Sequence, residues 1–241
     1  MSMAREPNLV GTGATHPGTV RTKNEDSLVL RPDLGLWAVA DGAGGHGAGD
    51  VASQAVAAAL QAIPGGMPAG ELLARVRMTV EGVHADLQRR AAAEGPNRVM
   101  ATTVVVLLAR HGHFACLWAG DSRAYLLRGG VLQRVTRDHS LVQEMVDQGT
   151  LTEEEAEAHP QANVILRAVG GGEELVLDKV TERLLADDRL MLCSDGLFKA
   201  LPESELTQMM LAGDDAAALV AAAVARGARD NVSVVTLSTE G

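Results

Sequence analysis

Short apolar stretches bounded by Gly, Asp or Asn recur along most of the chain. Their length and their content of Val, Leu and Ala are typical of β-strands with one or both faces buried. We predict strands at residues 9–15, 27–30, 35–41, 102–109, 113–121, 123–128, 131–136, 175–182, 189–195 and 231–238. Because most of these stretches are separated only by short turns, we expect mainly antiparallel pairing.

Other segments repeat apolar residues at a spacing of three to four, which predicts helices with one buried face. We predict helices at 51–63, 72–87, 140–149, 152–159 and 203–227. Ser140, Thr152 and Asp214 are the expected N-caps of the later helices, because their side chains can accept a hydrogen bond from a free backbone N–H group. Grouped helices between runs of strands indicate helical layers outside the sheets.

The stretch ADGAGGHGAGD at residues 40–50 raises the first question of function. Gly42, Gly44 and Gly47 fit the G-x-G-x-x-G pattern of a dinucleotide-binding loop. That loop belongs to a unit in which a second strand follows the helix, whereas here a second helix follows. Asp41 and Asp50 would also place negative charge where a pyrophosphate docks. A dinucleotide-binding enzyme therefore remains only a disfavoured alternative.

Aspartates follow or precede four of the apolar strands. Asp41, Asp121 and Asp195 end strands, and Asp230 begins the last strand. A single Asp at a strand end is usually a turn residue, but four carboxylates brought together would repel unless a cation lay between them. Oxygen ligands of this kind suit Mg²⁺ or Mn²⁺ and not zinc, and Gly42 leaves its own carbonyl accessible to such an ion.

The segment RTKNEDS adds Arg21, Glu25 and Asp26 upstream of this set. Taken alone it reads as a polar turn before a strand. Beside a metal site, an arginine could hold a phosphate through two hydrogen bonds, and the two acids could orient water around the ions.

The composition narrows the partner classes. The 241 residues carry 21 Lys and Arg against 31 Asp and Glu, a formal net charge of −10, which disfavours nucleic acid. Cys116 and Cys193 lie in apolar runs without metal-ligand spacing, as expected for buried thiols in a reducing compartment. No signal sequence or apolar run long enough to span a membrane is present. We expect a single domain over residues 1–241, in the cytoplasm, with no nucleic-acid or membrane partner.

Eight motifs, spread over nearly the whole chain, resemble in sequence and in order those of a bacterial, stand-alone member of the metal-dependent type 2C serine/threonine protein phosphatases. The motifs are RTKNEDS, VADGAGGHGAGDVAS, ATTVVVLL, LWAGDSRAYLLRGG, VTRDHSLVQEMVDQGTLT, HPQANVILRAVGG, LMLCSDGLF and ARDNVSVV. The resemblance implies an α+β fold, a four-layer α/β/β/α sandwich of two antiparallel sheets, with a flap at about 138–172.

The resemblance also implies roles for individual residues. Asp41 would bridge two Mn²⁺ or Mg²⁺ ions, Gly42 would give a carbonyl to one ion, and Asp195 and Asp230 would complete the other. Asp121 with Asp195 is similar to the pair that holds a third, weaker ion in bacterial members. Arg21 matches the phosphate-binding arginine, and Asn231 follows its ligand as the pattern expects.

A water bridging the two ions would then attack the phosphorus of phosphoserine or phosphothreonine. The resemblance makes Arg21, Asp41 and Asp195 the catalytic residues, supported by Glu25, Asp26 and Asn231. Where animal members carry a histidine proposed as general acid, this chain has Ala43. His46 is the candidate proton donor instead, and a water on the ions is the alternative. His139 matches a family motif and is expected to position other groups.

The expected partners are phosphoprotein substrates and a cognate Ser/Thr kinase whose action the enzyme reverses, with the protein itself a monomer. A catalytically silent phosphoprotein-binding module is the alternative function. The presence of Arg21, Asp41, Gly42, Asp195 and Asp230 counts against it.

Overall fold

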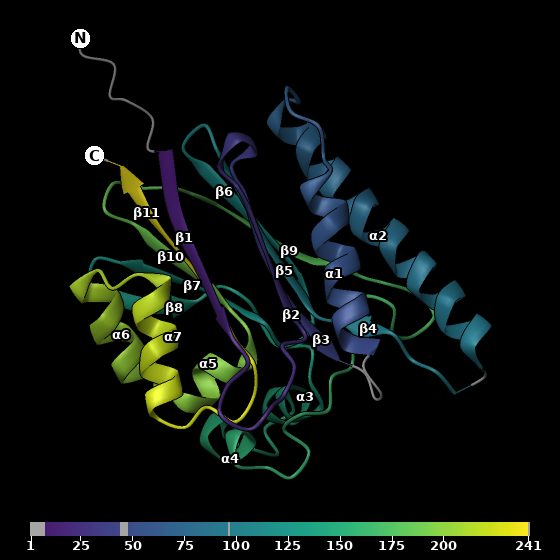
Figure 1. The fold of residues 1–241 in the computed structure, drawn as a ribbon. Coiled ribbons are helices and arrows are strands. Elements are labelled where there is room, and N and C mark those ends of the chain that lie inside the picture. The colour runs from purple at the N-terminus through teal and green to yellow at the C-terminus, as the bar shows by residue number, and fades with distance from the viewer. Residues whose placement is uncertain (1–7, 44–47, 96, 241) are drawn as a thin grey trace.

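Two antiparallel β-sheets lie face to face between layers of helices in the computed structural model, which describes residues 8–43, 48–95 and 97–240 (Figure 1). One sheet has the strand order β1 (Asn8–His16), β11 (Val232–Glu240), β10 (Arg189–Cys193), β7 (Arg123–Arg128) and β8 (Val131–Arg134). The other has the order β2 (Asp26–Arg31), β3 (Leu36–Ala43), β5 (Val104–Arg110), β6 (His113–Ala119) and β9 (Asp178–Arg183), and the short β4 (Ala101–Thr102) pairs with β3. A 3₁₀ turn, Pro32–Leu34, joins β2 to β3.

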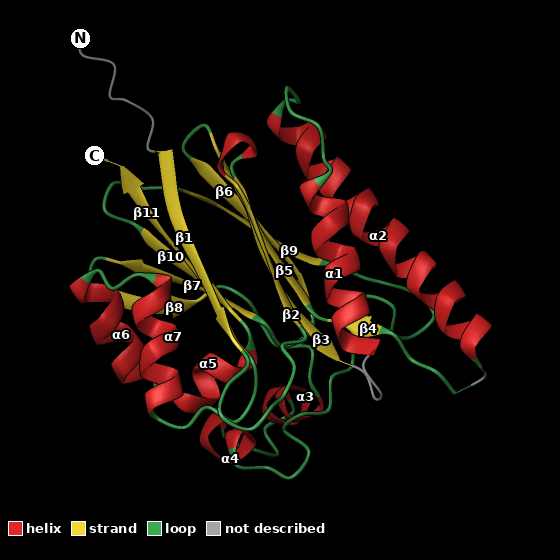
Figure 2. Ribbon diagram, in the orientation of Figure 1, coloured by secondary structure: helices red, strands yellow, loops and turns green. Residues whose placement is uncertain are grey.

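The helices form the two outer layers (Figure 2). On the second sheet lie α1 (Ala48–Gln61) and α2 (Ala69–Glu94). On the first sheet lie α5 (Asp195–Ala200), α6 (Glu203–Ala212) and α7 (Ala216–Ala225). The predicted four-layer α/β/β/α arrangement is confirmed.

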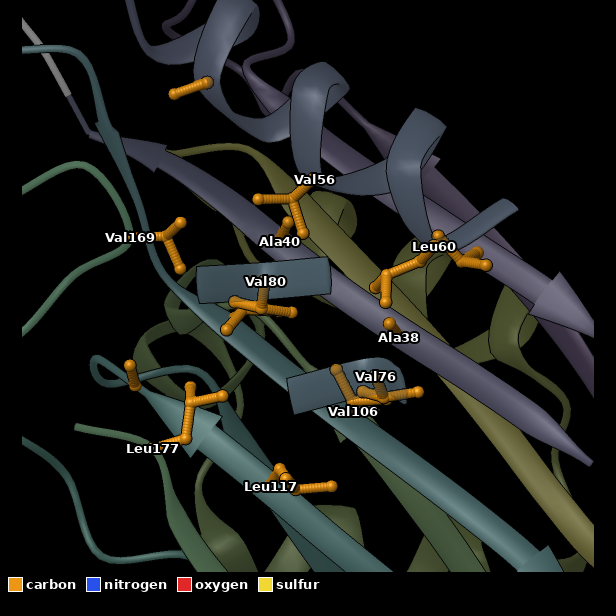
Figure 3. Packing of buried hydrophobic residues seen from close by; sticks show 14 of the residues in the cluster. Ala38, Ala40, Val56, Leu60, Val76, Val80, Val106, Leu117, Val169 and Leu177 are labelled. Atoms are coloured by element: carbon orange, nitrogen blue, oxygen red, sulfur yellow. The ribbon is translucent and has the colours of Figure 1, made fainter. Parts of the chain in front are cut away.

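The central strands β3, β5, β7 and β10 bury both faces, which is why their sequences are largely apolar. In β5, Val105 and Leu107 pack between the two sheets. Their neighbours Val104 and Val106 point the other way, into the layer beneath α1 and α2. Figure 3 shows this outer layer, where Val56 and Leu60 of α1 lie over the sheet. Three apolar layers therefore hold four layers of secondary structure together.

The segment between β8 and β9 contains α3 (Leu141–Asp147) and α4 (Glu153–Glu157), and we call residues 138–172 the flap. The flap is joined to the second sheet where Thr102 and Val169 exchange backbone hydrogen bonds of 3.0 and 2.8 Å. Trp118 of β6 also stacks on His139, with ring centroids 6.0 Å apart. Both helices of the flap lie near α5 at one edge of the sandwich (Figure 1).

The sequence predictions of local structure are mostly confirmed, with three corrections. Residues 102–109 form two strands instead of one, β4 and β5, with Thr103 between them. Helix α5 was not predicted, because six residues are too few to show helical periodicity. The N-cap expected at Asp214 was wrong: Asp215 caps α7, and its side chain accepts a hydrogen bond from the Ala218 N–H at 2.9 Å. Ser140 and Thr152 cap α3 and α4 as predicted.

In the part of the chain that the structure describes, no helix combines the length and apolarity needed to cross a lipid bilayer.

The two adjacent aspartates at the start of α7 allow a matched test of the cap. Asp215→Ala should lower the free energy of unfolding by about 1 kcal/mol, because it removes the acceptor for an N-terminal N–H group. Asp214→Ala should change it by only a few tenths of that value. Urea denaturation of both variants measures the difference, and equal losses would contradict the assignment of the cap.

Candidate metal centre

Five aspartates come from strand ends that meet at the edge of the sandwich nearest α3 and α5 (Figure 1). They are Asp26, Asp41, Asp121, Asp195 and Asp230. Asp26 and Asp41 lie directly opposite each other across β2 and β3. Asp121 follows β6, Asp195 begins α5 after β10, and Asp230 precedes β11. The centre therefore draws residues from both sheets, which no single local motif could supply.

Three of these carboxyl groups have raised pKa values and therefore resist ionisation. Burial, opposed by hydrogen bonds from Ser233 and Ser194 and assisted by the charge of Asp195, raises the pKa of Asp26 to about 6. Burial and the charge of Asp195 raise the pKa of Asp121 to about 7. Burial, followed by the charges of Asp26 and Asp195, raises the pKa of Asp41 well above its ordinary value. Carboxylates raise one another's pKa in this way when no cation separates them.

Hydrogen bonds fix Asp26 between the sheets. Ser194, at the end of β10, donates its hydroxyl to Asp26 Oδ2 at 2.8 Å and accepts the Ser233 N–H at 2.9 Å. No hydrogen-bond partner for the buried Asp26 Oδ1 exists among the described residues. A buried carboxylate oxygen without a donor is costly unless a cation or an ordered water meets it.

Close backbone contacts shape the approach to Asp41. A Cβ on Gly42 would lie 2.3 Å from the carbonyl oxygen of Gly49 at the start of α1, and 2.6 Å from that of Glu25. The Gly42 N–H donates to the Glu25 carbonyl at 3.2 Å. The carbonyl of Asp41 itself accepts the Thr103 N–H at 2.8 Å. Glycine is thus required at position 42 because α1 packs directly on the end of β3.

Asn231 joins the loop that carries Arg21 and Glu25 to the start of β11. Its Nδ2 donates to the carbonyls of Pro17 and Lys23 at 3.0 and 2.9 Å, and its Oδ1 accepts the Glu25 N–H at 2.8 Å. Asn231 is 5% exposed. Three hydrogen bonds of a buried side-chain amide therefore hold this loop beside Asp230.

Two cations meet the carboxylates at the edges of the centre. Arg21 Nη2 lies 2.8 Å from Asp230 Oδ2, and the Arg21 side chain is 58% exposed. Lys199 of α5 forms an ion pair with Asp195 Oδ2 and donates to Asn163 Oδ1 of the flap at 2.6 Å. Burial lowers the pKa of Lys199, but the charge and hydrogen bond of Asp195, together with the charges of Asp121 and Asp41, outweigh burial, so the pKa is raised.

The donor set fits a hard divalent cation. Its oxygens come from carboxylates and backbone carbonyls, which are the ligands that Mg²⁺ and Mn²⁺ prefer. Within the described ranges no three His, Cys, Asp or Glu side chains converge on one point at metal-binding distance. Instead Asp26, Asp195 and Asp230 are each turned toward a protein partner. The raised pKa of Asp41 shows that these partners do not supply enough positive charge to keep it ionised, and Asp26 Oδ1 has no donor among the described residues.

A cavity of about 890 Å³ opens beside the carboxylates, between the flap, α5 and the start of α6. Asp121, Lys199 and Asn163 line one part of it. Its acidic lining also includes Glu153, Glu154, Glu157 and Glu203. The lining also contains Arg123, Arg134 and Lys199, but these cations are fewer than the acids. None of the four glutamates has an ion-pair partner among the residues described, so the cavity carries a net negative charge.

A family model described as protein phosphatase 2C matches residues 12–231. The chain belongs to this family. It is 40% identical over 222 residues to the serine/threonine protein phosphatase PstP of Mycobacterium tuberculosis, a match covering 90% of this chain and 42% of that protein's length.

Solved structures agree with the family and with the predicted fold. PppA, described as a key regulatory component of T6SS in Pseudomonas aeruginosa, superposes with a TM-score of 0.88 at 38% identity, covering 96% of this chain and 98% of that one. The catalytic domain of PstP in complex with two manganese ions superposes with a TM-score of 0.86 at 34% identity, covering 97% of this chain and 99% of that one. The predicted family is confirmed.

Family membership and topology together exclude the dinucleotide alternative. Every strand pair in the described part of the chain is antiparallel, and α1 leads into α2 instead of a parallel strand. Gly44, Gly47 and the candidate proton donor His46 lie outside the described residues. Nor does Cys193 behave as a nucleophile, since burial raises the pKa of its thiol to about 12.

Sequence reasoning missed Ser194, Gly49, Lys199 and Asn163. Ser194 directly precedes Asp195, but only the packing of the two sheets brings its hydroxyl to Asp26 of β2. Lys199 lies one helical turn after Asp195, a signal that depends on knowing that α5 exists. His139, expected to position other groups, lies 3.2 Å from Asp178 and accepts the Gly120 N–H, so it joins the flap to β6 and β9.

The raised carboxyl pKa values predict how the metal-free protein responds to pH. The unfolded chain releases the protons of Asp26 and Asp121 near pH 4, whereas the folded protein keeps them until about pH 6 to 7. The free energy of unfolding should therefore fall as the pH rises between about pH 4 and 7. Asp121→Asn should flatten this dependence by roughly 1 to 3 kcal/mol.

Urea denaturation in EDTA at several pH values measures the effect. Glu81→Gln, at an exposed position on α2, is the control and should leave the slope unchanged. A stability that stays level or rises over the same interval would contradict the assigned burial of negative charge.

Proposed function

We propose that this chain is a metal-dependent phosphatase that hydrolyses phosphoserine and phosphothreonine monoesters in proteins. The observation that carries the proposal is the group of aspartates from both sheets, whose mutual repulsion calls for divalent cations beside an exposed arginine. Membership of the phosphatase 2C family supports the same reaction. Because the chain spans only 42% of the length of PstP, the activity is proposed for this chain on its own residues.

Asp41, Gly42, Asp195 and Asp230 are the residues that we propose to hold two Mn²⁺ or Mg²⁺ ions. Gly42 follows Asp41 in β3, and the charges of Asp195 and Asp230 help to raise the pKa of Asp41 well above its ordinary value. When bound, such ions lower the pKa of a water molecule and polarise a phosphoryl group. Binding requires Asp230 to turn from Arg21 toward the ions, while Asp195 can keep Lys199 on Oδ2 and offer its other oxygen, Oδ1.

The remaining residues bind and orient the substrate. The exposed guanidinium of Arg21 can hold two phosphate oxygens through parallel hydrogen bonds. Asn231 keeps the Arg21 loop in place, and Glu25 and Asp26 lie close enough to Asp41 to orient water around the ions. Hydrolysis adds water to phosphorus and breaks the ester P–O bond, so the departing serine or threonine oxygen needs a proton. His46 stays the predicted donor.

The cavity beside the flap is the proposed path of the substrate chain. It starts at Asp121 and Lys199 and leads between α4 and α6, a route for a peptide extending away from its phosphorylated residue. Glu154 and Glu157 on one wall and Glu203 on the other would attract Lys or Arg near the phosphorylation site.

Phosphoproteins are therefore the proposed substrates, and a Ser/Thr kinase that forms them the proposed counterpart. A monomer acting in the cytoplasm stays our prediction. Cys116 and Cys193 are both buried and unpaired, which suits a reducing compartment. The alternative of a silent phosphoprotein-binding module is not favoured, because the described catalytic candidates are all present and brought to one edge.

Mn²⁺-dependent phosphate release tests the function directly. A phosphothreonine peptide should lose phosphate in proportion to added Mn²⁺ with the unaltered protein, and Asp195→Asn should reduce kcat by about 100-fold or more. Asp86→Asn on α2 is the control and should keep full activity. If the folded protein binds the phosphopeptide but releases no phosphate at any Mn²⁺ concentration, the binding-module alternative replaces the enzyme.

The charge of the cavity predicts substrate preference. Glu154→Gln combined with Glu157→Gln should raise KM for a phosphopeptide with flanking Lys and Arg by about 3- to 10-fold at low ionic strength, with little effect on a neutral peptide. Glu71→Gln combined with Glu81→Gln changes the net charge equally on α2 and should leave both KM values unchanged. An equal effect of the two pairs would show that net charge alone, and not the cavity, sets the preference.

A further inference from the structure

Lys199 places a positive charge inside the group of carboxylates. It lies on α5 four residues after Asp195, so one helical turn brings its side chain back over that residue. Its ammonium group is bound at two points, to Asp195 Oδ2 and to Asn163 Oδ1 of the flap, the latter at 2.6 Å. The ammonium is therefore held in place instead of extending into solvent.

The influence of Lys199 extends beyond its direct partner. It interacts electrostatically with Asp121 and Asp41 as well as with Asp195. Asp121 and Lys199 line the same cavity. After burial, the charge of Asp195 contributes most to raising the pKa of Asp121, and the charge of Lys199 lowers it. One ammonium thus offsets part of the repulsion between Asp121 and Asp195.

These contacts decide what the pair of Asp121 and Asp195 can bind. We infer that Lys199 acts as a built-in cation at this pair, so that the protein binds two divalent ions at the Asp41 centre and no third ion at Asp121 and Asp195. The inference rests on the metal centre proposed above. It replaces the third, weaker ion that the family resemblance implied.

Tethering explains why the ammonium would prevail over a free ion. A charged group carried on the same helix turn has a high effective concentration at Asp195 Oδ2. A divalent ion held by only two protein carboxylates and water binds weakly and would have to displace it. No hydrogen bond to Asp195 Oδ1 is found among the described residues, so that oxygen remains for the ions held with Asp41.

Asn163 adds a second consequence. Because its side-chain oxygen accepts from the same ammonium, the flap is joined to the metal centre through Lys199. The exposed fraction of the Lys199 side chain is 37% and that of Asp195 is 13%, so the pair lies at the boundary between the centre and the cavity. A free ion at this position would leave the flap without this contact.

Equilibrium dialysis against Mn²⁺, with bound metal counted by atomic absorption, tests the inference without relying on turnover. The unaltered protein should saturate at two ions per chain. Lys199→Met should bind a third, weaker ion, and adding Asp121→Asn to that variant should return the count to two. Lys199→Arg, which keeps the charge, should also bind two.

Lys179→Met is the matched control, since Lys179 lies on β9 and does not line the cavity. It should bind two ions. Circular dichroism checks that each variant is folded, and Lys199→Gln carries the same expectation as Lys199→Met should the latter not fold.

Two results would overturn the inference alone: three ions bound by the unaltered protein, or two ions still bound by folded Lys199→Met and Lys199→Gln. The absence of any bound ion in the unaltered protein would overturn the proposed metal centre as well. The two failures are therefore distinguishable.

Discussion

Repulsion between buried carboxylates is the constraint on which this structure depends. Asp26 and Asp41 lie opposite each other across two strands, where like charges are destabilising. Asp121 and Asp195 add further negative charge from the other parts of the sandwich. Such a group can be maintained only because the two sheets and three apolar layers hold the strand ends in place, and because cations are brought to it.

The protein meets this constraint by assigning a different partner to each carboxylate. A serine hydroxyl satisfies one oxygen of Asp26, Arg21 meets Asp230, and Lys199 meets Asp195. The pKa of Asp41 is raised well above its ordinary value, and no cation of the described residues pairs with it, so it is the carboxylate that we propose the metal ions meet. Arg21 and Lys199 are permanent positive charges at the rim of the group, whereas the metal ions proposed at Asp41 can be exchanged. Reversible metal binding requires this separation.

The supporting contacts are as important as the ligands themselves. Asn231 ties the loop of Arg21 and Glu25 to the last strand through its amide. Gly196 packs directly against the Asn231 backbone, since a Cβ on that glycine would lie 2.0 Å from the Asn231 carbonyl oxygen. Asp195 and Asp230 therefore keep their relative positions through backbone packing. Three residues of the flap attach it to the same region: His139, Val169 and Asn163, the last through Lys199 of α5. These contacts place the cavity directly beside the centre.

The sequence by itself determined the strands, most helices and the aspartates that matter, because alternating apolar faces and acidic strand ends are local patterns. It also determined the family, through eight motifs in a fixed order. Tertiary structure decided what local patterns do not contain. Asp215 caps α7 instead of its neighbour because of where the chain enters the helix, and α5 is too short to have a period of its own. Ser194 reaches Asp26, and Lys199 joins Asp195 to Asn163, across long separations in the sequence. Those contacts depend on how two sheets and a flap meet, which no spacing of residues along the chain specifies.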